Sequence, residues 1–220
     1  HYEDASELTM YLEPDAAADN SSFGDVSINS TFSQLTWGDL SMEQSSPVEV
    51  TLKELDGIMG QVELQYLASR QTEDGRTEHY EVTDDFTLKW SEQRIYMMDF
   101  DRQVDEIFNG DPAAFSGKRI LLGITGDERV SAKASPNGKQ TAFCVNRDVW
   151  LYDQADEELV NVFSFRTGED QNSMEYKKHD VRILQVLDNG DIDFLLYGYM
   201  NRGRHEGQVG ICLLYTSDAA

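Results

Sequence analysis

The chain is poor in cysteine, because only Cys144 and Cys212 occur among its 220 residues. Small domains that depend on disulfides carry many more cysteines, so a disulfide-stapled fold is excluded. Cys144 lies between Phe143 and Val145 in an apolar run, a position typical of a small core residue and not of a nucleophile. We therefore expect a fold that is held together by a hydrophobic core.

Basic residues are also scarce. The chain has 18 lysines and arginines against 41 aspartates and glutamates, which gives a formal net charge of −23. Such a surface repels nucleic-acid phosphates and anionic lipid, so we expect no nucleic-acid partner and no direct membrane insertion by this segment. The acidic excess is typical of a soluble surface, and a specific cationic partner is the alternative.

Catalytic and metal-binding motifs are missing as well. There is no G-x-S-x-G, H-E-x-x-H or phosphate-loop motif, and the four histidines are too far apart in sequence to show a ligand spacing. The stretch DNGDID at 188–193 clusters oxygen ligands. However, its sixth and twelfth positions hold Asp193 and Tyr199, where a calcium loop needs glycine and glutamate. We predict no enzyme activity, no metal and no cofactor.

What is present is the alternation of apolar and polar residues that is typical of β-strands. In VEVTLKEL, residues 48–55, Val48, Val50 and Leu52 would share one face of a strand. The same period of two recurs at residues 62–66, 86–90 and 95–98. Turn-forming residues separate the runs at 73–76, 135–138 and 187–191.

One segment departs from this pattern, namely RQVDEIFNGDP at residues 102–112. Val104, Ile107 and Phe108 follow the i, i+3, i+4 spacing of a helix, and a glycine and a proline come next. We therefore expect a helix of about two turns here, connecting two sheet units.

Aromatic residues mark a repeated order of turn, strand, short turn and strand. Trp90, Phe143 and Phe194 are separated by 53 and 51 residues, and a further step of 53 residues back reaches Trp37. A period near 50 residues with about four short strands per unit is typical of a β-propeller blade. We predict an all-β fold, an incomplete β-propeller-like array of blade units of about 50 residues. A β-sandwich with a small β-domain is the alternative.

The best-formed unit, SPNGKQTAFCVNRDVWLYD at 135–153, resembles the blade repeat of TolB-like and WD40-like proteins and of prolyl oligopeptidase-type peptidases. Asn137 and Val149 depart from the aspartate and leucine that are usual in the repeat. The resemblance implies a place outside the cytoplasm, in the cell envelope or at the surface. The segment 195–211 is also similar to a stretch in large proteins of Gram-positive bacteria. The resemblance further implies scaffold roles for Ser135, Pro136, Gly138, Phe143, Asp148, Trp150 and Asp153.

Three regions are expected along the chain. Residues 1–30 are polar and resemble the partly irregular end of a truncated domain, and residues 31–211 hold the propeller-like repeats. The last nine residues, CLLYTSDAA at 212–220, resemble the in-frame translation of a sequencing adapter, so we expect a non-native tail.

A polar loop, NRGRHEG at 201–207, is the candidate binding site. It places cations between two apolar runs of a chain that is short of cations, and loops on rigid sheets often carry ligands. The alternative is a plain hairpin whose arginines pair with acids such as Asp188 or Asp193. The residues predicted to contact a partner are Asn201, Arg202, Arg204, His205 and Glu206.

These features favour a non-enzymatic, extracytoplasmic binding or protein-interaction module whose protein or small-molecule ligand is not identified by the sequence. The alternative implied by the resemblance is a propeller domain that gates the access of substrate to a prolyl oligopeptidase-type serine peptidase. Its catalytic domain would lie outside these residues.

Overall fold

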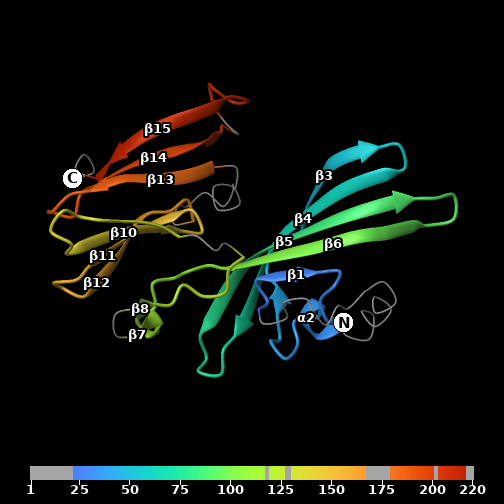
Figure 1. Ribbon diagram of the computed structural model, residues 1–220, viewed down its shortest axis with the longest axis horizontal. Coiled ribbons are helices and arrows are strands. Elements are labelled where there is room, and N and C mark those ends of the chain that lie inside the picture. The colour runs from blue at the N-terminus through green and yellow to red at the C-terminus, as the bar shows by residue number, and fades with distance from the viewer. Residues whose placement is uncertain (1–21, 117–118, 127–129, 167–178, 201–202, 217–220) are drawn as a thin grey trace. The chain divides into compact units, whose positions relative to one another are not determined.

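The computed structural model describes residues 22–116, 119–126, 130–166, 179–200 and 203–216. In this part of the chain the strands form three larger antiparallel sheets and one short pair, and no barrel is closed (Figure 1). The described residues up to Ile107, together with 122–126, form unit 1. Residues Phe108–Leu121 and the described residues from 130 onward form unit 2. The prediction of an all-β fold is confirmed.

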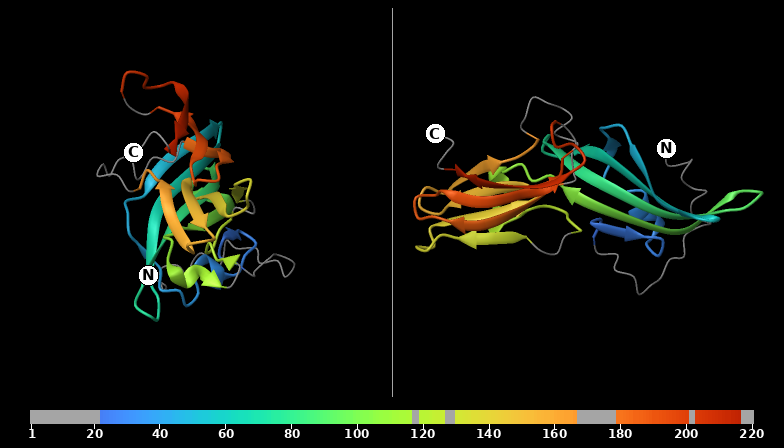
Figure 2. Two further views of the ribbon diagram at one scale, coloured as in Figure 1. Left: turned by 90° about the vertical axis from the view of Figure 1, so that its left-hand side faces the viewer. Right: turned by 90° about the horizontal axis from the view of Figure 1, so that it is seen from above.

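Unit 1 is built on a six-stranded antiparallel sheet with three long central strands. β4 (Met59–Gln71), β5 (Thr77–Trp90) and β6 (Ile95–Glu106) follow one another as a meander, and they curve along their length (Figure 2). β1 (Asp25–Ser27) pairs with β6, while β2 (Glu43–Gln44) and β3 (Glu49–Asp56) pair with different parts of β4. The four strands predicted from the period of two correspond to β3, β4, β5 and β6 and are confirmed.

The helix expected at 102–112 is wrong, because the first half of this segment continues β6. Val104 pairs with Val82 of β5, and both side chains are fully buried, so the period is two. The neighbouring inward position is Arg102, which bonds to Asp84 on β5. Because a charged residue occupies an inward position, the local sequence does not show the alternation of a buried strand.

A one-turn helix, α2 (Phe32–Leu35), lies beside this sheet. It begins with a capping box in which Thr31 and Gln34 exchange hydrogen bonds. Trp37 follows the helix in the left-handed region, with φ of 67°, and packs on a core cluster of the sheet. Trp37 therefore lies in a turn, and Trp90 is the last residue of a 14-residue strand. In unit 1 the aromatic spacing does not mark equivalent strands.

Unit 2 contains two antiparallel meanders. The first comprises β9 (Ser131–Ala134), β10 (Gln140–Val145), β11 (Asp148–Asp153) and β12 (Glu158–Phe163). The second comprises β13 (His179–Val186), β14 (Ile192–Tyr199) and β15 (Val209–Tyr215), so β15 includes the first four residues of the expected tail. A short 3-10 helix, η2 (Pro112–Ala114), and the pair β7 (Phe115–Ser116) and β8 (Arg119–Ile120) precede them.

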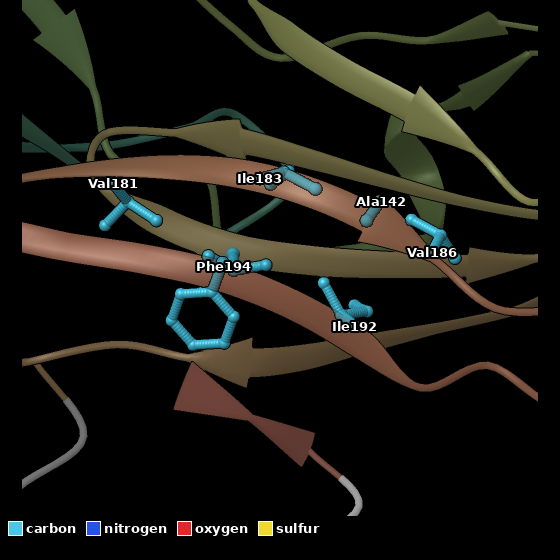
Figure 3. Packing of buried hydrophobic residues seen from close by; sticks show 7 residues of the cluster. Ala142, Val181, Ile183, Val186, Ile192 and Phe194 are labelled. Carbon is cyan, nitrogen blue, oxygen red and sulfur yellow. The ribbon is translucent and has the colours of Figure 1, made fainter. Parts of the chain in front are cut away.

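The two meanders of unit 2 pack on each other around a shared core. Figure 3 shows this cluster between strands of both sheets. The face-to-face packing fits the sandwich alternative, and the closure of blades around an axis stays a prediction. The buried members of the cluster are Ala142, Val149, Val181, Ile183, Val186, Ile192 and Phe194.

The spacing of 51 residues between Phe143 and Phe194 does mark equivalent positions in unit 2. Each lies in the second strand of its meander, three residues after the residue whose carbonyl closes the preceding turn. These closing bonds run from the Ser135 amide to the Gln140 carbonyl at 2.9 Å, and from the Leu187 amide to the Asp191 carbonyl at 2.8 Å.

Each of the two equivalent phenylalanines faces the part of unit 2 that precedes its own meander in the chain. Phe194 faces the first meander and contacts the ring of Phe163, with 5.4 Å between the ring centroids. Phe143 faces away from the second meander, because its neighbour Ala142 lies in the shared core and successive residues of a strand alternate in direction. It contacts Phe108, which precedes the first meander. The two sheets therefore stack head to tail.

Candidate binding surfaces

The polar loop that the sequence singles out lies between β14 and β15. Asn201 and Arg202 lie outside the described residues, while Arg204, His205 and Glu206 are exposed in a turn. The acids considered as partners for the arginines bond elsewhere. Asp188 accepts a hydrogen bond from the backbone of Asn137 at 2.9 Å, and Asp193 accepts one from the side chain of Gln185. The turn is open to solvent, and its binding role stays a prediction.

The residues assigned to the turn of the repeat make local hydrogen bonds. Buried Ser135 accepts a hydrogen bond from the Gln140 amide at 3.1 Å, and its carbonyl accepts one from the Gly138 amide at 2.9 Å. Gly138 has φ of 72°, which suits glycine, and Pro136 is exposed. The Gln140 side chain donates to Asp153 at 3.0 Å, and this bond lowers the pKa of that carboxyl. These contacts tie the ends of β10 and β11 together.

The remaining repeat residues pack on the other side of the first meander. Phe143 and Trp150 are cross-strand partners, and both are buried against Phe108, whose ring centroid lies 6.0 Å and 5.1 Å from theirs. Buried Asp148 forms an ion pair with Arg166 at 2.8 Å. These contacts lie within unit 2, and the scaffold roles that the resemblance implies stay a prediction.

Cys144 and the turn at 187–191 are the two positions that the sequence offers for reactive or metal-binding chemistry. The Cys144 thiol is largely buried, and burial raises its pKa to about 12, so it holds little of the reactive thiolate. In the described part of the chain, no three histidine, cysteine, aspartate or glutamate side chains are arranged so that they could hold a metal ion. In the turn at 187–191, Asn189 and Asp191 bond to each other. Nor does this part of the chain contain a helix that is long and apolar enough to cross a bilayer.

The six-stranded sheet of unit 1 has one mainly apolar face, which the Asp84–Arg102 ion pair interrupts. Directly opposed residues of neighbouring strands project to the same face, and one such row runs through Leu52, Val62, Phe86 and Phe100. We call this the apolar face. Its inner half is the part near α2, and its outer half is the part toward the hairpin turns β3–β4 and β5–β6 (Figure 1).

The inner half of the apolar face is buried. Ala68, Tyr80, Val82 and Val104 form its core, and Trp37 with other residues covers them. Trp37 and Met42 belong to the segment between β1 and β4, and Ile124 comes from residues 122–126.

A buried ion pair closes the inner half. The Arg102 guanidinium donates two hydrogen bonds to the Asp84 carboxylate, at 2.6 Å and 3.0 Å, and a third to the Leu35 carbonyl at 2.9 Å. The guanidinium also lies over the ring of Trp37, 4.8 Å from its centroid. Both charged side chains are at least nine-tenths buried, so each depends on the other for its stability.

The outer half of the apolar face is uncovered. Val50 is 66% exposed, Leu52 59% and Leu55 70%, and Leu55 lies opposite Gly60 on this same face. Trp90 and Ile95, which are cross-strand partners, are similarly exposed. Ile58, in the turn between β3 and β4, is also exposed, and its carbonyl accepts a hydrogen bond from the Trp90 amide at 2.7 Å. We define the outer apolar patch as Val50, Leu52, Leu55, Ile58, Trp90 and Ile95.

The opposite face of the same sheet carries acidic residues. Glu63, Asp85 and Asp101 lie in one cross-strand row on β4, β5 and β6. Partial burial, together with the nearby carboxylates, raises the pKa of Asp85 and of Asp101. Because like charges that are directly opposed destabilise a sheet, this acidic row lowers the stability of unit 1. The sheet thus has one mainly apolar face and one acidic face.

Strand β3 forms a free edge of this sheet. It pairs with β4 on one side, and no described strand pairs with its other side. Seven of its eight residues are exposed. Near its end, a shallow groove of about 180 Å³ is lined by Glu54, Asp56, Met59, Gly60, Gln61 and Thr87.

Comparison with known proteins gives no relative, since no protein-family model, no curated protein and no solved structure matches the chain. The period of two in the sequence predicts the strands of the outer patch but not its exposure, because the alternation of residues 48–55 is the same in a covered and an uncovered strand.

Proposed function

We propose that this protein is a non-enzymatic protein-interaction module and that the outer apolar patch is its principal binding surface. The observation that carries the proposal is the exposure of five large apolar side chains on one half of a sheet face, with exposed Ile58 in the adjoining turn, whereas the other half of the face is buried. Contiguous apolar surfaces of this kind in soluble proteins are typical of interaction sites. A partner that covers the patch would remove these side chains from water and gain the hydrophobic free energy.

The rest of the proposal concerns the repeat and the location. The head-to-tail stack of the two meanders supports a blade-like role for unit 2, since blades of a propeller follow one another in this way. The acidic surface and the resemblance of residues 135–153 to TolB-like repeats support a place outside the cytoplasm.

A peptide-display experiment tests the proposal. Random peptides are selected on the immobilised chain and then measured against the variant Leu52→Ser/Leu55→Ser. We expect the selected peptides to lose at least about tenfold in affinity for this variant, because its binding surface has become polar.

The matched control is Val160→Ser/Leu187→Ser, which replaces two partly exposed apolar residues of unit 2. This variant should bind the peptides as the wild type does, and circular dichroism should show both variants folded. Selected peptides that bind all three proteins equally, or a selection that yields no binder, would overturn the proposal.

A further inference from the structure

We propose that the free edge of β3 accepts an extended segment of a partner protein in which apolar and basic residues alternate. The inference rests on the proposed function and gives the partner a chemical class. The segment would add a strand to the unit 1 sheet, with its apolar side chains extending the outer apolar patch and its basic side chains on the acidic face.

The backbone of β3 carries the first part of the argument. An edge strand presents unpaired amide and carbonyl groups, and extended peptides bind such edges through main-chain hydrogen bonds. β3 is eight residues long and almost wholly exposed, and no other strand of the described residues pairs with its outer edge. Eight residues is an ordinary length for a strand of a globular protein, so β3 is long enough to pair with an added strand.

The side chains of β3 specify what the added strand should carry. Val50, Leu52 and Leu55 lie on the apolar face, while Glu49 and Glu54 lie on the other. Directly opposed side chains on neighbouring strands interact, so apolar residues are favoured opposite the first set and cations opposite the second. A partner strand that alternates apolar and basic residues matches both faces at once.

Two local features agree with a cationic partner. The groove beside Glu54 and Asp56 has Met59 in its lining, so a lysine or arginine could place its aliphatic stem on the thioether and its charge at the carboxylates. The one basic residue of β3, Lys53, lies at a bulge and is already paired with Glu63. It therefore offers little repulsion to an incoming cation.

The same charges argue against a second copy of this chain as the occupant. Antiparallel pairing of β3 with itself would bring acidic side chains opposite acidic side chains, in a chain whose net charge is already −23. Like charges in such positions destabilise the pair. The edge is thus better suited to a partner of opposite charge.

The test uses a fluorescent peptide of about ten residues that alternates valine and lysine, measured by anisotropy on the full chain. Three control peptides separate the contributions. One alternates glycine and lysine, one has valines and lysines in two blocks, and one alternates valine and glutamate. We expect each control to bind at least about tenfold more weakly, since each lacks the apolar side, the alternation or the charge.

Backbone pairing is tested with two further peptides, N-methylated at the odd or at the even positions. One of them should lose binding, because alternate residues of an added strand donate to the edge. The variant Glu54→Gln/Asp56→Asn should weaken binding by at least about tenfold, while Glu158→Gln, an exposed change on β12, should leave it unchanged.

Each other outcome has a definite meaning. Equal binding of the block or glycine peptide shows charge attraction only, and equal binding of both N-methylated peptides rules out strand addition. Concentration-dependent dimerisation in sedimentation that Leu52→Ser abolishes would make a second copy the occupant. If the alternating peptide fails while selected peptides still depend on Leu52 and Leu55, the partner chemistry is wrong and the proposed function stands.

Discussion

Both halves of the apolar face in unit 1 carry large apolar residues, yet one half is buried and the other is exposed. In the inner half, Val82 and Val104 are fully buried under the segment that holds Trp37. In the outer half, Val50 and Leu52 meet solvent. The comparison teaches that alternation places a residue on a face, whereas the rest of the chain decides whether that face serves folding or binding.

The largest difference in stability between the two halves is expected when the buried ion pair of the inner half is removed. Asp84→Asn leaves the Arg102 guanidinium buried without its counter-charge, so the free energy of unfolding should fall by about 3–5 kcal/mol in urea titration. The double variant Asp84→Leu/Arg102→Met replaces the pair by apolar groups and should recover most of this loss. A loss below about 1 kcal/mol for the single variant would show that the arginine finds water or another partner.

A matched pair of identical substitutions sharpens the comparison. Val82→Ala removes two methyl groups from a fully buried position and should cost about 1.5–3 kcal/mol of unfolding free energy, from lost burial and a residual cavity. Val50→Ala makes the same change on the exposed outer half of the apolar face and should alter the free energy of unfolding by no more than about 0.5 kcal/mol. Equal costs for the two changes in urea titration would mean that the outer half is covered in solution.

The smallest expected effect lies on the acidic face. Because the pKa of Asp85 is raised in the folded state, its contribution to stability is fully present below the ordinary value of 3.8 and is lost as the pH rises through the raised pKa. Asp85→Asn removes a charge between Glu63 and Asp101, so it should stabilise the protein by about 0.2–1 kcal/mol at neutral pH.

The advantage of Asp85→Asn should shrink as the pH falls through the raised pKa, and unfolding titrations at a series of pH values measure it. A variant that is less stable than the wild type at neutral pH would contradict the expected repulsion. It would mean that attraction to Lys53 outweighs the neighbouring carboxylates.

Much of the fold could be predicted from the sequence, since the period of two located the long strands and the turn residues located the hairpins. The segment 102–112 could not, because Arg102 occupies an inward position that only its partner on another strand explains. Trp37 fits the aromatic spacing by sequence but lies in a turn with positive φ, and spacing carries no information on backbone conformation.

The candidate site was harder to predict. The loop at 201–207 stands out by composition, and its described residues are exposed, as its charges suggest. The outer apolar patch has no local signature, because exposure depends on which distant segments cover a face. Val50 and Val82 are alike in type and in alternation, and only the tertiary structure separates them.

The head-to-tail order of the two sheets in unit 2 has a consequence for symmetry. Two sheets related by a two-fold axis would pack through equivalent faces, so neither sheet would have that face left to pack on a third. A head-to-tail relation is heterologous, because unlike faces of the two sheets meet. The face of the first sheet that packs on the second has an equivalent in the second sheet, and this equivalent face points away from the first sheet. In the second sheet this face carries Leu195, Tyr197 and Ile211, and Ile211 is 71% exposed. The second sheet therefore leaves exposed the face that, in the first sheet, packs on its neighbour.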